Sequence, residues 1–402
     1  MATNLSSLLS QRVLNMAESA TLRMAKLGRE VRAQGHDVIS LSLGEPDFDT
    51  PEHIKAAAKE ALDAGKTKYT PVPGIPELRQ AISNKFKREN DLDYAPSQIV
   101  VSNGAKQSIA NLAWALLDEG DEVVILAPYW VSYSEIVSVA GGVPVLVGAG
   151  IEQDYKVSPA DIEAAITDKT KFILFSSPCN PTGSVYTHDE LSGIAKMLAK
   201  FPNVMVVADE IYEHINFTGK HVSIGTMPEV KDRTITVNGF SKGFAMTGWR
   251  LGYLGAPEFI AKAVTKVQGQ STSGANSIAQ VAGAHALTTS LQPTIEMREA
   301  FERRRELIID GLSNIPGFRV NRPQGAFYIF PDVSALFGTS NGEWSISNSD
   351  DFAEYLLMTA HVATVTGAAF GAPNCIRISY AASEAQLEEA IKRIAKVVGE
   401  LA

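Results

Sequence analysis

The sequence predicts an α/β fold, with a large domain built on a mostly parallel sheet and a smaller α+β domain. Short apolar runs rich in Val, Ile and Leu alternate with longer stretches of helical periodicity as far as Leu291, which is the order of a βαβ fold. The runs lack polar alternation, as do parallel strands that are buried on both faces. After Leu291 the pattern changes to a long charged helix followed by short strands and turns.

The strands of the large domain follow from these apolar runs. Ligands of such sheets gather at the carboxyl ends of the strands, so the residues just after each run are candidate site residues. Asp209 directly follows one run, and Lys242 comes soon after another. The predicted strands are Val123–Leu126, Val143–Val147, Phe172–Phe175, Val204–Ala208, Thr234–Val237 and Leu251–Leu254.

The smaller domain combines the two ends of the chain. A predicted helix at Thr21–Gln34 and a strand at Val38–Leu43 have no partner near them in sequence, so we expect them to pack on the C-terminal elements. Those elements are a helix at Pro293–Leu312, strands and turns in Gly317–Pro331, and helices at Asp350–Thr359 and Ser383–Leu401. The predicted division is residues 1–44 as an arm and part of the small domain, 45–292 as the large domain, and 293–402 as the small domain.

The bulk composition narrows the classes of partner. The 402 residues are 45% apolar and carry a net charge of -9, which argues against nucleic acid or an anionic membrane surface. The two cysteines, Cys179 and Cys375, have no metal-ligand spacing and suit a reducing compartment. No leader-like start and no apolar run of membrane length are visible. We therefore expect a soluble, cytoplasmic protein without a metal.

The stretch Asn238–Arg250 is the most informative of the chain. Lys242 lies between Ser241 and Gly243, and a primary amine in a dry pocket has a lowered pKa and forms an imine with an aldehyde. The guanidinium of Arg250 suits a phosphate. An aldehyde that carries a phosphate indicates pyridoxal 5'-phosphate (PLP). The alternative is a solvated surface lysine.

A second candidate phosphate site precedes the helical pattern that follows Asn103. Gly104, Ala105 and Lys106 form a turn of small residues that opens this pattern. Free backbone N–H groups and the helix dipole favour an anion at such a helix start. Many helices begin in this way without a ligand, so the pattern alone leaves both interpretations open.

Asp209 and Glu210 end an apolar strand. Asp209 could hydrogen-bond a protonated pyridine nitrogen, or it could be a magnesium ligand of a nucleotide triphosphatase. The second interpretation needs a phosphate loop, but Glu60 stands where that loop's first glycine belongs before Gly65–Thr67. Glu210 could cap a following helix, and on such a helix Tyr212 would share the face of Asp209.

Two further motifs offer groups for a ligand. Asn180 lies in the rigid turn Ser177–Gly183, where its amide can donate to a ligand oxygen, although a plain turn uses the same residue types. Arg377 stands inside an apolar strand-like alternation. A substrate carboxylate would satisfy its guanidinium bidentately, and an internal salt bridge is the alternative.

Taken in chain order, these motifs resemble those of the class I aminotransferases among the fold-type-I PLP enzymes. The resemblance runs from about Ser19 to the end of the chain. It is strongest with the bacterial aspartate aminotransferases and the aspartate/prephenate aminotransferases, through Gly44–Pro51, Lys66–Thr70, Ala127–Tyr133 and Ala245–Arg250. The motifs that carry it are Gly104–Lys106, Asn180–Gly183, Asp209–Tyr212, Ser241 with Lys242, Arg250 and Arg377.

The resemblance implies a role for each of these residues. Lys242 would hold PLP as an internal aldimine and would then move the substrate Cα proton. Asp209 would keep the pyridine nitrogen protonated. Asn180 and Tyr212 would hydrogen-bond the ring oxygen. Ser241, Arg250 and the backbone of Gly104, Ala105 and Lys106 would hold the phosphate, with Tyr69 reaching it from the neighbouring subunit of a homodimer, and Trp130 would stack on the ring next to the substrate. Arg377, helped by Gly44 and Asn180, would bind the substrate α-carboxylate.

The expected activity is transamination between L-aspartate and 2-oxoglutarate in amino-acid metabolism, with Lys106 as the cation for the distal carboxylate. Relatives often have a lysine where this chain has Ala17, followed here by Glu18, which argues against prephenate. Aminotransferases for prephenate, aromatic or neutral amino acids and C–S β-lyases remain alternatives. A transcription regulator with such a domain would need a DNA-binding module, for which the residues before Gly44 are too few.

Overall fold

A seven-stranded sheet with the order β2-β8-β7-β6-β5-β3-β4 forms the centre of the computed structural model, which describes residues 8–402. Only β8 runs antiparallel to its neighbours, and the other pairs are parallel. The fold class is therefore α/β, as predicted. The strands are β2 Ile99–Ser102, β3 Glu122–Ala127, β4 Val143–Gly148, β5 Thr170–Ser176, β6 Met205–Asp209, β7 Thr234–Gly239 and β8 Gly252–Gly255.

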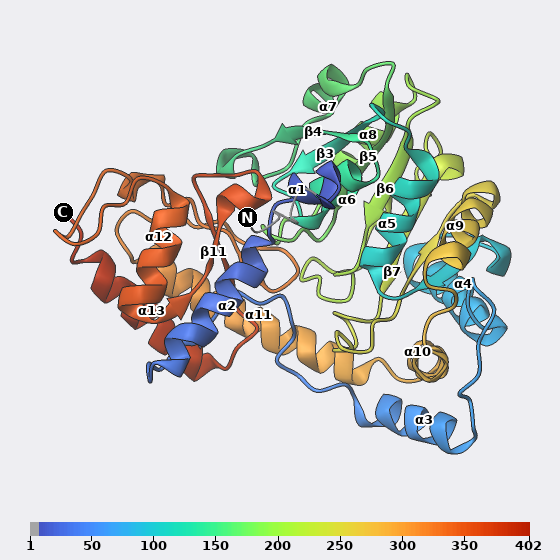
Figure 1. The fold of residues 1–402 in the computed structure, drawn as a ribbon, viewed down its shortest axis with the longest axis horizontal. Helices are drawn as coiled ribbons and strands as arrows, with labels where there is room; N and C mark the ends of the chain where they lie inside the picture. Colours follow the sequence, from blue (N-terminus) through green and yellow to red (C-terminus); the bar gives the residue numbers. More distant parts are fainter. Residues whose placement is uncertain (1–7) are drawn as a thin grey trace, which may run out of the picture.

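Helices cover both faces of this sheet (Figure 1). Val123 and Ile125 of β3 pack in the core beneath α5, α6 and α9, whereas Val124 and Leu126 pack in the core beneath α7 and α8. Burial on both faces explains the absence of polar alternation in the strands. The helices are α3 Glu52–Asp63, α4 Pro76–Asn90, α5 Ala105–Leu116, α6 Ser132–Val139, α7 Pro159–Ala165, α8 His188–Leu198, α9 Glu258–Ser271 and α10 Ser277–Thr288.

The antiparallel strand β8 matters for the site. Because β2, β3, β5, β6 and β7 are parallel, their carboxyl ends meet at one edge of the sheet. The amino end of β8 lies at the same edge because β8 runs the other way. Arg250, just before β8, therefore comes to the edge where Asp209 ends β6. Every strand of the sheet except β2 is predicted by an apolar run in the sequence.

The C-terminal elements form a second unit around a three-stranded sheet of order β11-β12-β9. The long helix α11 leads into this unit, and the N-terminal helix α2 lies beside it (Figure 1). Strand β1 pairs in parallel with β10, and Met24 of α2 packs against Leu357. The elements are α1 Gln11–Leu14, α2 Ala20–Ala33, β1 Ile39–Ser40, α11 Gln292–Ser313, β9 Tyr328–Ile329, α12 Ser349–Tyr355, β10 Val362–Ala363, β11 Val365–Thr366, β12 Ile376–Ser379 and α13 Glu384–Val398.

The predicted packing of both chain ends on each other is therefore observed, and the domain boundaries after residues 44 and 292 stay a prediction. The predicted helix at Asp350–Thr359 divides into α12 and a π-helical stretch, Leu356–Ala360. Across residues 8–402, no helix has both the length and the apolar character that crossing a bilayer requires.

One local prediction is wrong. No helix follows Asp209, because the chain passes through a series of turns there. Glu210 therefore caps no helix, and its carboxylate instead accepts hydrogen bonds from Asn90 and Ser223. These turns, and not a helix, bring Tyr212 to the same edge of the sheet as Asp209.

Candidate active site

A cavity of about 520 Å³ opens at the carboxyl edge of the large sheet. It brings together residues of most of the motifs that carry the predicted chemistry. The predicted site residues that line it are Gly44, Ala105, Lys106, Trp130, Asn180, Asp209, Tyr212, Ser241, Lys242, Arg250 and Arg377. Gly104 lies directly beside it, against Arg250. Tyr69 is 100% exposed and does not line it.

Lys242 lies in the loop between β7 and β8 and is partly exposed to the cavity. Its Nζ donates a hydrogen bond to the backbone oxygen of Gly44 and lies 5.8 Å from the ring centroid of Tyr212. Burial lowers the pKa of this ammonium to about 8. A lysine in this state supplies a substantial fraction of free amine near neutral pH, which is what imine formation needs.

Asp209 lies at the end of β6 and is 4% exposed. Its Oδ2 accepts a hydrogen bond of 2.7 Å from the Tyr133 hydroxyl, and its Oδ1 accepts one from the backbone N–H of Ile211. Burial raises the pKa of the Asp209 carboxyl to about 6. Within residues 8–402 this carboxylate forms no ion pair, so a protonated ring nitrogen in the cavity would supply the missing positive partner.

Tyr212 and Asn180 approach the same cavity from different loops. The Tyr212 hydroxyl is 2.7 Å from that of Tyr328, and burial holds the pKa of Tyr212 well above its usual value. Asn180 uses its amide oxygen to accept from Arg377 Nη1 at 3.0 Å. The amide nitrogen of Asn180 is therefore available to donate to a ligand oxygen.

The start of α5 forms a cradle that suits a phosphate. Gly104 has φ +85°, and a Cβ at this position would lie 2.5 Å from Nη2 of Arg250. The Arg250 guanidinium is held by the backbone oxygen of Thr247 at 3.0 Å. The first backbone N–H groups of a helix have no acceptor within the helix, so the first turn of α5 and Arg250 together offer donors to an anion.

Arg377 on β12 is 2% exposed. Its Nη2 donates to the backbone oxygen of Ser42 at 2.6 Å, and its Cζ lies 4.6 Å from the ring centroid of Tyr328. Its Nε is buried without a hydrogen-bond partner among residues 8–402, and no described carboxylate pairs with this guanidinium. The internal salt bridge that was the alternative interpretation is therefore not present, and a substrate carboxylate would satisfy the guanidinium.

Lys106 lines this cavity and also a neighbouring one of about 550 Å³. Its Nζ lies 4.8 Å from the ring centroid of Trp130, and partial burial together with the charge of Arg250 lowers its pKa. Ala17 and Glu18, which the sequence analysis singled out, line the neighbouring cavity. The structure thus places the expected distal cation and Glu18 around one continuous region.

Two tyrosines of the site, Tyr133 and Tyr328, were not among the residues predicted from the sequence. Tyr133 lies in the stretch Ala127–Tyr133 that carries part of the resemblance, but only the start of α6 at Ser132 turns its hydroxyl toward Asp209. Tyr328 comes from the C-terminal unit, and a Cβ on Gly44 would lie 2.6 Å from its hydroxyl. Nothing local in the sequence marks the contacts of Tyr328, because Gly44 and Tyr212 are both far from it along the chain, and its hydroxyl meets that of Tyr212 only when the C-terminal unit packs against the unit of the large sheet.

The donors and acceptors of the cavity fit PLP. They comprise a lysine with a lowered pKa, a buried carboxylate without a cation, an amide and a phenol for a ring oxygen, and an anion cradle that a side chain at Gly104 would fill. Each meets a separate requirement of that one group. A magnesium and phosphate-loop site is not supported, since neither Gly65 nor Lys66 lines the cavity.

Comparison with known proteins gives one consistent family. The family model of the class I and II aminotransferases matches residues 36–394. A probable aspartate/prephenate aminotransferase of Rhizobium leguminosarum bv. phaseoli is 49% identical, with 95% of this chain and 96% of the relative covered. An aspartate aminotransferase of Bacillus sp. (strain YM-2) is 48% identical, with 97% and 99% covered.

Solved structures agree with the sequence comparison. The aspartate aminotransferase of Rhizobium meliloti has a TM-score of 0.95 at 43% identity, covering 98% of this chain and 99% of that one. The aspartate aminotransferase of Thermus thermophilus, solved with maleate, has a TM-score of 0.91 at 45% identity, covering 97% and 99%.

Proposed function

This chain belongs to the class I and II aminotransferases, which are PLP-dependent, and we propose that it transfers the amino group of L-aspartate to 2-oxoglutarate. The products are oxaloacetate and L-glutamate. The observation that carries this choice of substrate is the set of cations at the cavity. Lys242, Arg250 and Arg377 each serve another purpose, which leaves Lys106 for a distal carboxylate.

PLP, when bound, supplies an aldehyde for a lysine amine and a ring that accepts the electron pair left by a departing Cα proton. Asp209 would hold a proton on the ring nitrogen, and the missing cation partner of its buried carboxylate supports this role. Asn180 and Tyr212 would donate hydrogen bonds to the ring oxygen. Ser241, Arg250 and the amides after Gly104 would bind the phosphate, while Trp130 would pack on the ring.

The substrate is bound through its two ends. Arg377 takes the α-carboxylate, because its Nε is buried without a partner in the described chain. Asn180 and the backbone of Gly44 orient the same end. The Nζ of Lys242, when it is free, would take the substrate Cα proton and deliver it to the cofactor's C4' carbon, since its pKa of about 8 lets the amine act as a base near neutral pH.

Relatives with known substrates support an acidic amino acid. The Thermus thermophilus aspartate aminotransferase was solved with maleate, a four-carbon dicarboxylate like aspartate. Glu18 opposes this choice to some extent, since it adds a negative charge to the cavity that adjoins Lys106. Lys106 lines both cavities, whereas Glu18 lines only the neighbouring one, so the attraction of Lys106 for the distal carboxylate prevails.

A second candidate substrate is prephenate. Relatives from Rhizobium leguminosarum bv. phaseoli and Cereibacter sphaeroides are named for both aspartate and prephenate. The neighbouring cavity is lined largely by apolar side chains such as Trp114, Tyr129 and Val139, which would accept a ring. Ala17 removes the lysine that relatives often carry in this segment, and we therefore rank prephenate second.

The substitution Lys106→Ala tests the role of the distal cation. It keeps the backbone amide of the phosphate cradle and removes only the ammonium. We expect kcat/KM for L-aspartate to fall about 10- to 150-fold, the loss of one charge-assisted contact of about 1.5–3 kcal/mol. L-Alanine, which has no distal carboxylate, is the matched control donor, and its kcat/KM should change less than about 2-fold. Equal losses for both donors would refute the assignment.

We further propose a cytoplasmic homodimer in which each subunit completes the other's site. Tyr69 is 100% exposed in the single chain, and this exposure supports a role for its phenol in a partner subunit's phosphate cradle. Cys179 and Cys375 are both free and buried, which suits a reducing compartment.

A further inference from the structure

A group of charged and polar side chains lies behind the cavity, on the far side of the turn Glu210–His214. We call it the charge cluster. Lys85 and Glu213 are its centre, with side chains 0% and 3% exposed. The charge cluster comprises Lys85, Glu89 and Asn90 of α4, together with Glu210, Glu213, His214 and His221.

The turn Glu210–His214 connects the charge cluster to the reacting groups. Asp209, Ile211 and Tyr212 line the cavity, whereas Glu210 and Glu213 bind the charge cluster. The turn belongs to neither a helix nor a strand. Because the backbone of this turn lacks the continuous hydrogen bonds of a helix or strand, side-chain contacts do much to hold Tyr212 in position.

Lys85 is the hub of these anchors. Its Nζ donates to Oε1 of Glu213 and, at 2.7 Å, to Oδ1 of Asn90. The Asn90 amide nitrogen donates to Oε2 of Glu213 at 2.6 Å. Burial opposes ionisation of Glu213, yet the charges around it, that of Lys85 first, hold its pKa at about 2. Glu213 is therefore charged throughout the working pH range and depends on Lys85.

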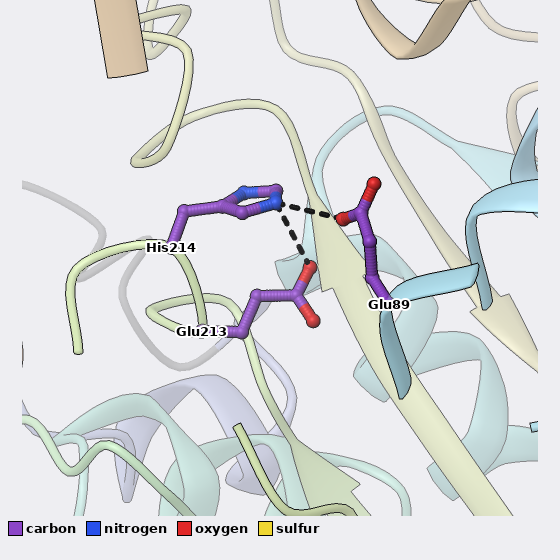
Figure 2. A group of neighbouring side chains, drawn as sticks. All are labelled: Glu89, Glu213 and His214. Carbon is purple, nitrogen blue, oxygen red and sulfur yellow. Dashed lines mark hydrogen bonds and ion pairs between the residues drawn. The ribbon is translucent and has the colours of Figure 1, made fainter. Parts of the chain in front are cut away.

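A metal site is the obvious alternative for part of this group. Figure 2 shows Glu89, Glu213 and His214 turned toward one another, and Nε2 of His214 is 3.0 Å from Glu89 Oε2 and 3.8 Å from Glu213 Oε1. Such a donor set can hold a divalent cation. The Lys85 ammonium already bonds the same Glu213 oxygen and lies 3.8 Å from the same Glu89 oxygen. An internal cation thus takes the place that a metal would need.

His214 links the charge cluster to the loop that carries Lys242. A Cβ on Gly243 would lie 2.5 Å from Nδ1 of His214, so the imidazole packs directly against the backbone that follows Lys242. The ring is also 5.3 Å, edge to face, from Phe244. One end of the charge cluster therefore touches the Lys242 loop while its centre binds the Tyr212 turn.

We propose that Lys85 is a positioning residue for the reaction: through Glu213 and His214 it fixes the turn of Tyr212 against the loop of Lys242. Its effect on the cofactor is indirect. A displaced Tyr212 would stabilise the anionic ring oxygen less well, and the proton held between ring oxygen and imine nitrogen would be lost at a different pH. The proposal rests on the proposed PLP-dependent function.

The test uses the double variant Lys85→Met/Glu213→Gln in the full-length holoenzyme. It removes one positive and one negative charge, so the net charge and the long-range field stay nearly unchanged. We expect the pH midpoint of the cofactor's visible absorbance to shift by at least about half a unit. We also expect kcat for the best donor to fall about tenfold, with KM changed less than about twofold. The matched control is Lys55→Met/Glu52→Gln, an ion pair with side chains 31% and 82% exposed, which should change neither quantity.

The outcomes are distinct. A double variant with the wild-type midpoint and wild-type kcat would overturn the proposal. If the double variant does not fold, His214→Ala at the half-buried edge must give the midpoint shift, and an unchanged midpoint there would overturn it equally. The absorbance titration needs no amino donor, so it is independent of whether aspartate is the substrate. A wild-type protein that shows no visible cofactor band would instead refute the proposed function itself.

Discussion

Burial shifts the two central titratable residues of the cavity toward their neutral forms. It lowers the pKa of the Lys242 ammonium to about 8 and raises that of the Asp209 carboxyl to about 6. The same low dielectric disfavours both charges, and a cofactor that supplies a reactive carbonyl and a basic ring nitrogen uses both residues at once. Separate surface residues would not show these paired shifts.

The rate at which the protein without cofactor captures PLP should follow the titration of Lys242. The neutral amine is the nucleophile, so its fraction rises with pH below the pKa of about 8 and is nearly constant above it. Stopped-flow absorbance between pH 6 and 10 should show a rise that levels near pH 8, and Lys242→Arg should show no capture. A rate that keeps rising beyond pH 9 would mean that the lysine has its ordinary pKa.

Arg377 should contribute to substrate binding more than to folding. Replacing it by Gln removes a charge-assisted pair with the α-carboxylate, so kcat/KM for aspartate should fall about 10- to 150-fold, which corresponds to about 1.5–3 kcal/mol. Thermal unfolding should change little, because the described chain offers this buried guanidinium no carboxylate partner. Unchanged kinetics with a lowered Tm would assign Arg377 to structure alone.

At the scale of elements, the ends of strands decide which residues meet. The sequence was sufficient to predict that the site lies at the carboxyl edge of the large sheet. Strands that are buried on both faces appear in the sequence as apolar runs, and Asp209 follows one of these runs directly. The sequence could not predict the turn that carries Tyr212. A helix after Asp209 fits the local sequence, but Glu210 and Glu213 bind Asn90 of the charge cluster, and these contacts are distant in sequence. The contact of Tyr328 with Gly44 also depends on tertiary structure.

The helix start at Gly104 gives an element-scale prediction. In Gly104→Ala the new Cβ would meet the Arg250 guanidinium 2.5 Å away, so the affinity for PLP should fall at least about tenfold. Gly120→Ala is the matched control, because Gly120 has the same φ of +85° and no atom within 4 Å of such a Cβ. Both variants should lose similar stability, about 1 kcal/mol, from the strained backbone. If fluorescence titration gave the two variants equal affinities for PLP, the start of α5 would not be the phosphate site.

At the scale of the whole molecule, the site is assembled from two units and, in our proposal, from two chains. The large sheet supplies Lys242 and Asp209, and the C-terminal unit supplies Arg377 and Tyr328. The sequence predicted that the two ends of the chain pack together, because neither the helix at Thr21–Gln34 nor the strand after it had a local partner. The subunit contact stays a prediction, carried by the resemblance and by the exposure of Tyr69.

Mixing two inactive variants tests the shared site. In a heterodimer of Lys242→Ala and Tyr69→Ala chains, one site has both defects and the other has neither. We expect each pure variant to be weak, and the mixture, after exchange of subunits, to regain up to about a quarter of the wild-type activity, since random mixing makes half of the dimers mixed with one intact site each. A mixture no more active than the average of the two variants would place Tyr69 outside the partner's site.

The amino donor that reacts fastest in a single turnover tests the central claim most directly. The holoenzyme is mixed with L-aspartate, L-alanine or L-phenylalanine without an oxo acid, and the cofactor's absorbance follows the loss of its aldehyde form. The set of cations in the cavity predicts that L-aspartate reacts fastest. Faster conversion by L-alanine or L-phenylalanine, or pyruvate released from cystathionine without an amino acceptor, would contradict the assignment.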